Sequence, residues 1–294
     1  MIKIVQNLLD ALSVGATYAL LALGLTLIFS VMNLINFAYG LLLVWGAYAA
    51  YALGAAGVPF VLVVPLCVIF VTVLSMVMGR VAFRPFIGAP PITLLITSFG
   101  VLLVGQYLAI LIFGEKPHVL EVPAFLNSVI TAGELRIPAL QLITIASGVL
   151  IVGAFYALLN RTAFGARLRA SAEQPETARL MGIKPDRVLM LAFAISGVIA
   201  GVVGLLWFVK VGAVTPRSDL EPTLKAFIAL VLGGLGRVSG AILGGLALGA
   251  IEVLMNITLP AGAIVYAQAI VFAIVIAILV LRPGGLGGTR TEAA

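Results

Sequence analysis

Long apolar stretches fill most of the 294-residue chain and constrain its fold more than any other feature. Because an α-helix rises about 1.5 Å per residue, about 20 apolar residues cross the ~30 Å hydrocarbon core of a bilayer. Stretches close to or beyond that length occupy residues 8–29, 37–57, 58–79, 92–113, 139–159, 188–208, 238–258 and 262–281. The shorter stretch 223–236 predicts a ninth segment or a half-helix. We therefore predict an all-α, polytopic integral membrane protein with about eight transmembrane helices.

The composition supports this prediction. Hydrophobic residues make up 63% of the chain and charged residues only 10%, with a mean hydropathy of +1.25. Soluble domains contain about 25% charged residues, so this chain cannot cover a folded surface with enough charge to stay in water. The spans leave no room for a sizeable soluble domain, and we expect residues 1–294 to form a single transmembrane domain.

Basic residues near the ends of the spans predict the orientation, because short cytoplasmic loops carry an excess of Lys and Arg. The connections 80–91 and 160–187 and the C-terminal tail all have this excess, whereas the connection 114–138 does not. We therefore expect the first three in the cytoplasm and 114–138 outside. If the segment 223–236 crosses, or reaches deep enough to bring Arg237 to the cytoplasmic side, the C-terminus is cytoplasmic and the N-terminus lies outside. The net charge of +6 follows from this loop pattern, and we expect no nucleic-acid partner.

The titratable residues do not predict a catalytic or metal site. The one histidine, His118, lies in a predicted outward loop, so neither a histidine-based triad nor a histidine-rich metal site can form. The glycine-rich segment GGLGRVSG (233–240) lacks the Gly-Lys-Ser/Thr ending of a nucleotide-binding loop. We expect no enzyme activity and no metal, nucleotide or other cofactor bound by this chain.

Polar residues at membrane depth are a better lead, because each is costly in lipid and tends to line a pathway or face a partner. The densest set lies in SVMNLINFAYG, between the first two spans, and comprises Asn33, Asn36, Phe37, Tyr39 and Gly40. One interpretation is an interrupted helix that lines a path for a small substrate. The other is an ordinary turn whose asparagines cap the next helix. The spacing alone does not decide between them.

Glu252 is an acidic residue inside an apolar span. It lies ~9 Å from the predicted outer end of its helix at about 1.5 Å per residue. We expect its side chain to reach the membrane interface, as long polar side chains do. A proton- or cation-coupled transport step is the alternative, but the sequence reveals no second buried acid or base to pair with it.

Small residues three or four positions apart recur in two spans and place glycines on one helix face. Such faces let helix backbones approach closely in lipid, so we interpret them as tight packing. They are Gly197, Gly201 and Gly204 in one span, and Gly240, Gly244, Gly245 and Gly249 in another.

The longest polar run is SAEQPETARLMGIKPDR, residues 171–187. Pro175 suits the first turn of a helix, Glu173 and Glu176 place negative charge at its N-terminal end, and Gly182 suits its stop. A helix of about two turns is not stable alone in water, so it must dock against something. It is either an amphipathic turn on the membrane surface or a peg that fits a socket on another protein.

Several stretches together resemble a known family. They are GATYALLALGLTLIFSVMNLINFAYG (15–40), RPFIGAPPITLLITSFG (84–100), RLRASAEQPETARLMGIKPDRV (167–188), GVIAGVVGLLW (197–207) and LKAFIALVLGGLGRVSGAILGGLALGAIEVL (224–254). In this order they resemble the permease subunits of ATP-driven importers of branched-chain amino acids. This is the high-affinity leucine/isoleucine/valine permease family, and the chain is most similar to its smaller permease chain. The resemblance covers nearly the whole chain.

The resemblance implies a single permease domain over 1–294, with a cytoplasmic coupling loop at 160–187. The residues that would contact an ATP-binding subunit are Ala172, Glu173, Ala178, Arg179 and Gly182. Those near the translocation path would be Asn33, Asn36, Phe37, Tyr39 and Gly40. A gating half-helix would end at Gly233, Gly234 and Gly236. The family often has acidic or amide residues in the coupling segment where this chain has Gln174 and Pro175, which affects the expected start of the peg.

The resemblance also implies the partners and the location. We expect a second permease chain of different sequence, two ATP-binding subunits that hold ATP and Mg, a periplasmic substrate-binding protein and membrane lipid. The expected location is the bacterial inner membrane. The expected cargo is branched-chain or other hydrophobic amino acids. Alternatives are urea or short amides as cargo, or a stand-alone secondary transporter, which should have paired buried charges or strong internal symmetry.

Overall fold

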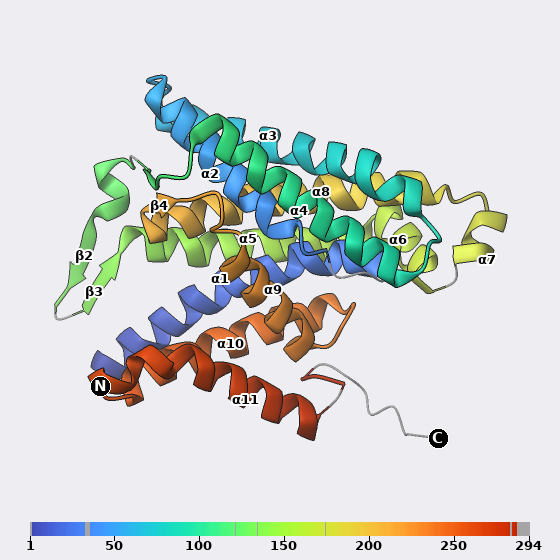
Figure 1. The fold of residues 1–294 in the computed structure, drawn as a ribbon. Coiled ribbons are helices and arrows are strands. Elements are labelled where there is room, and N and C mark those ends of the chain that lie inside the picture. The colour runs from blue at the N-terminus through green and yellow to red at the C-terminus, as the bar shows by residue number, and fades with distance from the viewer. Residues whose placement is uncertain are drawn as a thin grey trace. The chain divides into compact units, whose positions relative to one another are not determined.

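The computed structural model describes residues 2–32, 36–120, 122–133, 135–173, 175–282 and 284–286, and most of them are helical (Figure 1). Among these residues, seven helices are long and apolar enough to cross a membrane. The prediction of an all-α, polytopic membrane protein is therefore confirmed. These spans are built on α1 (Ile2–Met32), α3 (Phe60–Met78), α4 (Pro91–Phe113), α5 (Ala139–Arg161), α8 (Pro185–Val211), α10 (Val238–Thr258) and α11 (Ala267–Leu281).

Two further helices are shorter than these spans. The helix α2 (Tyr39–Ala55) has 17 residues, at the lower end of the length of about 17–25 residues that spans a bilayer. The helix α9 (Leu220–Gly233) has 14 residues and would reach only ~21 Å at 1.5 Å per residue. The predicted segment 223–236 is therefore a half-helix rather than a full span.

The described residues fall into two compact units. One, here called the terminal unit, comprises residues within 1–26, 123–152 and 225–294, and the other, here called the central unit, comprises residues within 27–122 and 153–224. The helices α1, α5 and α9 each pass from one unit into the other. A single permease domain over the whole chain stays a prediction.

In the central unit, α8 packs along α3 and α2, and the glycines of α8 explain the close approach. A Cβ atom at Gly201 would lie 2.9 Å from the Cα of Val68 on α3, and one at Gly204 would lie 3.0 Å from the Cα of Leu43 on α2. Gly197 approaches α3 in the same way. The predicted role of this glycine face in tight packing is confirmed.

In the terminal unit, the glycines of α10 have the same role on two faces. A Cβ atom at Gly245 would lie 2.3 Å from the Cα of Ala19 on α1, and one at Gly244 would lie 2.0 Å from the carbonyl oxygen of Ala229 on α9. Gly249 repeats the contact with α1 one turn further along. Both faces of α10 therefore depend on residues without a side chain.

Short irregular elements connect the spans. The helix α3 continues as a π-helical turn (Gly79–Phe83) and a 3₁₀ turn (Arg84–Phe86), and two further 3₁₀ helices cover Ala124–Asn127 and Ala261–Tyr266. The strand β1 (His118–Val119) pairs antiparallel with β4 (Ala213–Val214) in the central unit, and β2 (Val129–Ala132) pairs antiparallel with β3 (Leu135–Pro138) in the terminal unit. These ladders were not predicted from the sequence. The first one joins the chain just after α4 to the chain just after α8.

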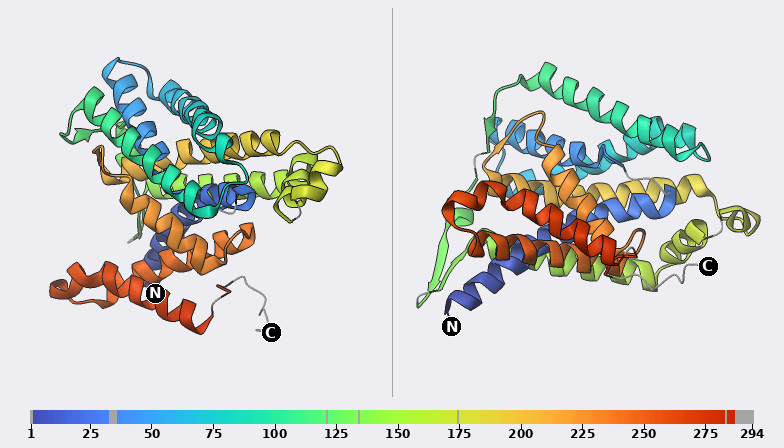
Figure 2. Two further views of the ribbon diagram at one scale, coloured as in Figure 1. Left: turned by 45° about the vertical axis from the view of Figure 1, so that its right-hand side comes forward. Right: turned by 60° about the horizontal axis from the view of Figure 1, so that its bottom comes forward.

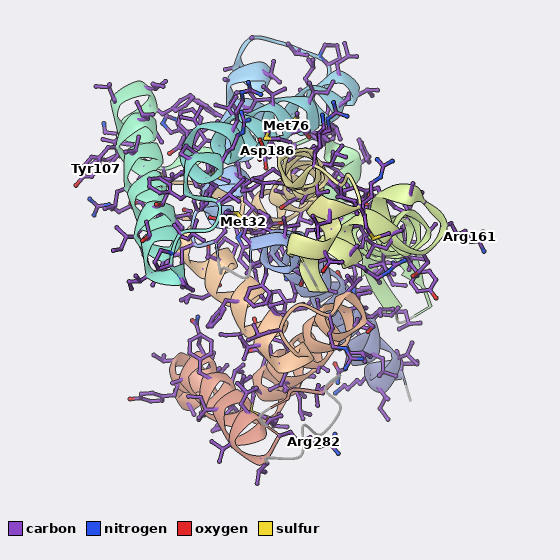
Figure 3. All side chains as sticks on the ribbon, turned by 90° about the vertical axis from the view of Figure 1, so that its right-hand side faces the viewer. Met32, Met76, Tyr107, Arg161, Asp186 and Arg282 are labelled. Carbon is purple, nitrogen blue, oxygen red and sulfur yellow. The ribbon has the colours of Figure 1, made fainter. Side chains whose placement is uncertain are left out.

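Large apolar side chains are exposed along the spans, as expected where lipid or another membrane chain takes the place of water. On α4, Tyr107 is 64% exposed and its side chain points away from the helix (Figure 3), while Ile112 and Leu111 are exposed one turn further on. This pattern fits a membrane-embedded surface.

Candidate functional site

The break between α1 and α2 contains a buried asparagine whose amide is only half satisfied. Asn36 is fully buried, and its Oδ1 accepts a hydrogen bond from the backbone N–H of Ala38 at 3.0 Å. Its Nδ2 atom and the hydroxyl of Tyr39 are buried without a hydrogen-bond partner in the described part of the chain. Each unsatisfied group of this kind costs ~1–3 kcal/mol. The bond from Ala38 is a local turn bond, and the N-cap of α2, Ala38, has no side-chain capping hydrogen bond. An ordinary turn therefore explains the oxygen of Asn36 but neither of these two donors.

The other residues predicted for the translocation path do not share the environment of Asn36 and Tyr39. The ring of Phe37 stacks on that of Phe99 at 4.7 Å between centroids. A Cβ atom at Gly40 would lie 2.0 Å from Oγ1 of Thr223 and 2.4 Å from the carbonyl oxygen of Asp219. Gly40 is therefore a contact point between α2 and the start of α9. Asn33 lies outside the described residues.

A buried acid lies just before the start of α9. Asp219 is only 1% exposed, and its Oδ1 accepts a hydrogen bond from Nε2 of Gln106 on α4 at 2.7 Å. Burial raises the pKa of Asp219, and the hydrogen bond from Gln106 opposes this effect. The hydroxyl of Thr223 donates to the backbone oxygen of Asp219 at 2.6 Å. The sequence analysis did not identify Asp219 or Gln106.

The terminal unit contains a second polar group, the buried charge cluster of Tyr18 (α1), Lys225 (α9) and Glu252 (α10). The hydroxyl of Tyr18 donates to Oε2 of Glu252 at 2.7 Å, and Nζ of Lys225 forms an ion pair with the same oxygen. The ammonium group of Lys225 also lies 5.3 Å from the centroid of the Tyr18 ring. The side chain of Lys225 is 4% exposed and that of Glu252 is 25% exposed.

The buried charge cluster corrects the expectation for Glu252. The expectation that it has no buried partner was wrong, because Lys225 on another helix forms an ion pair with it. That its side chain reaches the membrane interface stays a prediction. The paired buried charges expected of a secondary transporter are thus present, contrary to the sequence analysis. Lys225 and Glu252 are 27 residues apart, so no periodicity within one helix could have linked them.

The end of α9 has the geometry that only glycine permits. Gly234 and Gly236 have φ values of +101° and +76°, which residues with a side chain rarely adopt. A Cβ atom at Gly233 would lie 1.9 Å from the carbonyl oxygen of Gly240 at the start of α10. The three glycines therefore form the turn between the half-helix and α10. Their role in gating stays a prediction.

The predicted coupling segment forms two helices, α6 (Ala163–Glu173) and α7 (Pro175–Leu180). The predicted helix start at Pro175 is confirmed, whereas α6 was not predicted. Figure 2 shows α6 and α7 together near the N-terminal end of α8. Gln174 lies outside the described residues, and the side chains of Ala172, Glu173 and Arg179 are not described.

The end of α7 and the turn after it expose two apolar side chains and bury a third. Ala178 is buried, whereas Leu180 is 89% exposed and Met181 is exposed beside it. Gly182 has a φ value of +81°, and the backbone N–H of Ile183 donates to the oxygen of Ala178 at 3.0 Å. This glycine-terminated turn confirms the predicted stop of the helix.

A basic groove of about 1010 Å³ lies beside Gly182 in the central unit. Arg84 forms an ion pair with Asp186 at 2.6 Å across it, and Asp186 is labelled in Figure 3. The other basic lining residues are Arg80, Lys184 and Arg187. The groove therefore carries positive charge next to the end of α7.

Residues 7–279 match the family model described as branched-chain amino acid transport system / permease component. The chain belongs to this family. It is 30% identical over 301 residues to the high-affinity branched-chain amino acid transport system permease protein BraD of Pseudomonas aeruginosa, covering 96% of this chain and 95% of BraD. It is 32% identical over 298 residues to the corresponding protein LivH of Escherichia coli K12, with the same coverage. Family members are transport permease subunits rather than enzymes.

A more distant relative has a different cargo in its name. The chain is 30% identical over 261 residues to the fructose import permease protein FruF of Bifidobacterium longum, covering 84% of this chain and 68% of FruF. No solved structure matches the chain. The resemblance on which the sequence analysis relied is confirmed over nearly the whole length.

Proposed function

We propose that this chain is the membrane-spanning permease subunit of an ATP-driven importer that moves branched-chain or other hydrophobic amino acids across the bacterial inner membrane. The observation that supports this most strongly is the family match over residues 7–279, together with the names of BraD and LivH. The partners would be a second permease chain, two ATP-binding subunits that hold ATP and Mg, and a periplasmic substrate-binding protein.

The translocation path would pass the break between α1 and α2. Unpaired Nδ2 of Asn36 and the free hydroxyl of Tyr39 support this assignment, because a buried donor left without a partner in one state can gain one from substrate or water in another. Gly40 would allow α2 and the start of α9 to stay in close contact. Phe37 would form part of the wall of this path. Asn33 is assigned to the path from the family resemblance alone.

Coupling to the ATP-binding subunits would use α7 and its flanks. A short helix that ends in an exposed leucine and a glycine-terminated turn has the shape of a peg. Ala172, Glu173, Arg179 and Gly182 would lie in this contact. Ala178, which was also predicted there, is buried within the chain and would not touch the partner directly. ATP binding can shift the permease between states only if the ATP-binding subunits bind those states with different affinity, and α7 would transmit that difference.

Gating would involve the half-helix α9 and the glycine turn of Gly233, Gly234 and Gly236. The turn is compatible with a change in backbone direction because it uses positive φ values. The buried charge cluster ties the first turns of α9 to α1 and α10 within the terminal unit. A motion of the end of α9 would then pivot about Lys225.

The orientation is supported by contacts at the start of α1. Nε2 of Gln6 donates to the backbone oxygen of Arg136 in β3 at 2.8 Å, and Nε2 of Gln141 donates to Oδ1 of Asp10 at 2.9 Å. The N-terminal end of α1 therefore lies beside β3 and the start of α5. The strand β3 ends the connection 114–138 and α5 follows it, and this connection lacks the basic excess of a cytoplasmic loop and is therefore expected outside. We propose an N-terminus outside and a C-terminus in the cytoplasm.

An uptake assay tests the cargo. The chain would be expressed with candidate partner subunits, reconstituted into vesicles, and supplied with radiolabelled leucine, isoleucine, valine, urea and short amides. We expect ATP-dependent uptake of the three branched amino acids. Uptake of urea or amides alone would overturn the proposed cargo, and uptake without ATP-binding subunits would instead favour a secondary transporter.

A further inference from the structure

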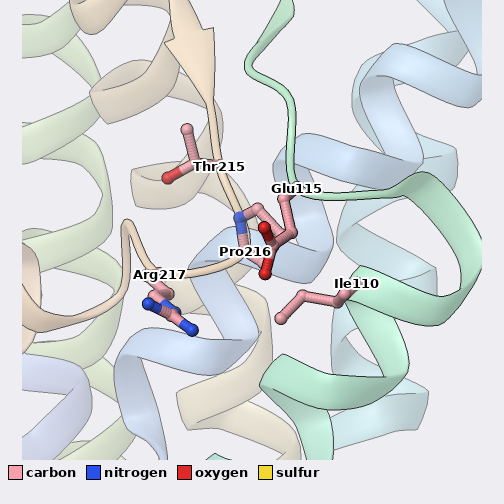
Figure 4. Close-up of a pocket in the computed structure, with 5 residues that line it drawn as sticks. All are labelled: Ile110, Glu115, Thr215, Pro216 and Arg217. Carbon is pink, nitrogen blue, oxygen red and sulfur yellow. The ribbon is translucent and has the colours of Figure 1, made fainter.

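A small pocket in the central unit lies apart from the residues discussed so far. It has a volume of about 230 Å³ and is lined by Ile110, Glu115, Thr215, Pro216 and Arg217 (Figure 4). This volume is below the ~300 Å³ at which pockets for drug-sized ligands begin. The pocket is therefore suited to a small molecule.

Two chain segments form the pocket, and backbone hydrogen bonds hold them together. Just beyond the lining residues, β1 pairs with β4 through His118 and Val214, and the backbone N–H of Leu120 donates to the oxygen of Gly212 at 3.2 Å. Gly114, with a φ value of +81°, turns the chain directly after α4. The two walls thus have a fixed relation to each other.

The wall that carries Arg217 is also ordered by its own turn. The backbone N–H of Ser218 donates to the oxygen of Thr215 at 3.1 Å, and Oγ of Ser218 accepts from the backbone N–H of Thr215 at 3.1 Å. Pro216 and Arg217 are the central residues of this turn. Their backbone is thereby fixed before any ligand arrives, which lowers the entropic cost of binding.

The two walls carry opposite charges that do not form an ion pair with each other. The carboxylate of Glu115 and the guanidinium of Arg217 both face the space between the segments, and the side chain of Ile110 faces it as well (Figure 4). Within the described ranges, neither Glu115 nor Arg217 takes part in an ion pair. The pocket therefore offers one anionic, one cationic and one apolar contact to a ligand.

We propose that this pocket binds a zwitterionic aliphatic amino acid. The guanidinium of Arg217 binds the α-carboxylate, because a planar guanidinium can donate two parallel hydrogen bonds to a carboxylate. The carboxylate of Glu115 binds the α-ammonium group, and Ile110 contacts the apolar side chain. The inference rests on the proposed function, in which such an amino acid is the cargo and the 114–138 connection faces the side from which it arrives.

Both charged side chains are exposed, so solvent screens them and binding is weak. Weak binding suits a site that receives cargo and releases it. The arrangement also requires both charged groups of the ligand. A carboxylate without an ammonium group, or an amine without a carboxylate, uses only one of the two walls and binds less well than the zwitterion.

Ligand binding to the assembled importer in lipid nanodiscs, without its binding protein, tests the proposal. Saturation-transfer NMR would compare L-leucine with 4-methylpentanoate, which lacks the ammonium group, and with 3-methylbutylamine, which lacks the carboxylate. We expect leucine to bind best. Removing a charge-assisted hydrogen bond should weaken leucine binding about tenfold in Arg217→Gln and in Glu115→Gln.

Two controls separate the pocket from general surface charge. Arg217→Lys keeps the charge but loses the two parallel donors of the guanidinium, so it should bind leucine less tightly than the wild type and more tightly than Arg217→Gln. Lys116→Gln changes the exposed neighbour of Glu115, which does not line the pocket, and should leave binding unchanged. Co-purification of each variant with its partner subunits shows that it is folded and assembled.

The proposal is overturned if the wild-type importer binds no amino acid, or if Arg217→Gln and Glu115→Gln bind leucine as the wild type does. It is also overturned if these variants lose affinity only for the binding protein, because the pocket would then be a protein-docking surface. Uptake assays on the wild type distinguish this failure from that of the proposed function. If the wild type takes up leucine but the variants bind it normally, only the pocket assignment fails.

Discussion

Removing Glu252 alone from the buried charge cluster should destabilise the permease far more than removing Glu252 and Lys225 together. In Glu252→Leu, Lys225 would remain 4% exposed without its counter-ion. Breaking a buried ion pair in this way costs ~3–5 kcal/mol. The hydroxyl of Tyr18, which donates to Glu252 at 2.7 Å, would also lose its acceptor, and that loss adds ~1 kcal/mol.

The opposite single change should cost less. In Lys225→Met, the remaining carboxylate of Glu252 is 25% exposed and keeps its hydrogen bond from Tyr18. Partial hydration and this bond should limit the loss to ~2–3 kcal/mol. In the double variant no buried charge is left unpaired, and replacing a buried pair by apolar residues is often neutral. We expect a total loss below ~2 kcal/mol, and thus a coupling energy of at least about 4 kcal/mol.

The assay is denaturant unfolding of the purified importer complex in detergent, for the wild type, both single variants and the double variant. Glu221→Gln is the matched control, because this acid lies in the same helix α9 but is exposed. Exposed substitutions of this kind usually change stability by less than ~0.5 kcal/mol. The reasoning is refuted if the single variants behave like the control, or if the double variant loses the sum of both single losses.

Three further changes test the proposed roles of single residues. Asn36→Ser keeps an oxygen that can accept from the backbone N–H of Ala38 but removes the unpaired amide nitrogen. Uptake should therefore fall at least about tenfold while stability changes by less than ~1 kcal/mol, and unchanged uptake removes Asn36 from the path. Leu180→Asp should abolish co-purification with the ATP-binding subunits without a change in melting temperature, and normal co-purification would contradict the peg assignment. Gly40→Ala should destabilise the protein by ~1–3 kcal/mol through overpacking. Gly54→Ala on the same helix is the control, because no atom lies within 4 Å of the added Cβ. Equal effects would show that α2 and α9 can move apart to accommodate the methyl group.

The sequence predicted the spans because hydrocarbon imposes a length and a composition on each of them. It also predicted where α7 begins and ends, since Pro175 and Gly182 have specific backbone preferences. The helix α6 was not predicted, because its polar residues lack such signals. The start of α2 at Tyr39 agreed with the predicted span to within two residues.

Contacts between distant residues could not be predicted from one sequence. Lys225 and Glu252 form an ion pair across two helices, and Asp219 is bonded to Gln106, 113 residues away. None of these residues alone indicates which residue it pairs with. The pairings β1–β4 and β2–β3 were missed for the same reason, because strands of two to four residues carry too little pattern to identify.

The central claim is that this chain moves amino acids only as part of an ATP-driven assembly. The most direct measurement is uptake of radiolabelled leucine into vesicles that contain the complete importer, with binding protein on the outside and ATP inside. The account predicts uptake that disappears when ATP, the ATP-binding subunits or the binding protein is left out. Leucine uptake by the permease chains alone, or none by the complete assembly, would contradict it.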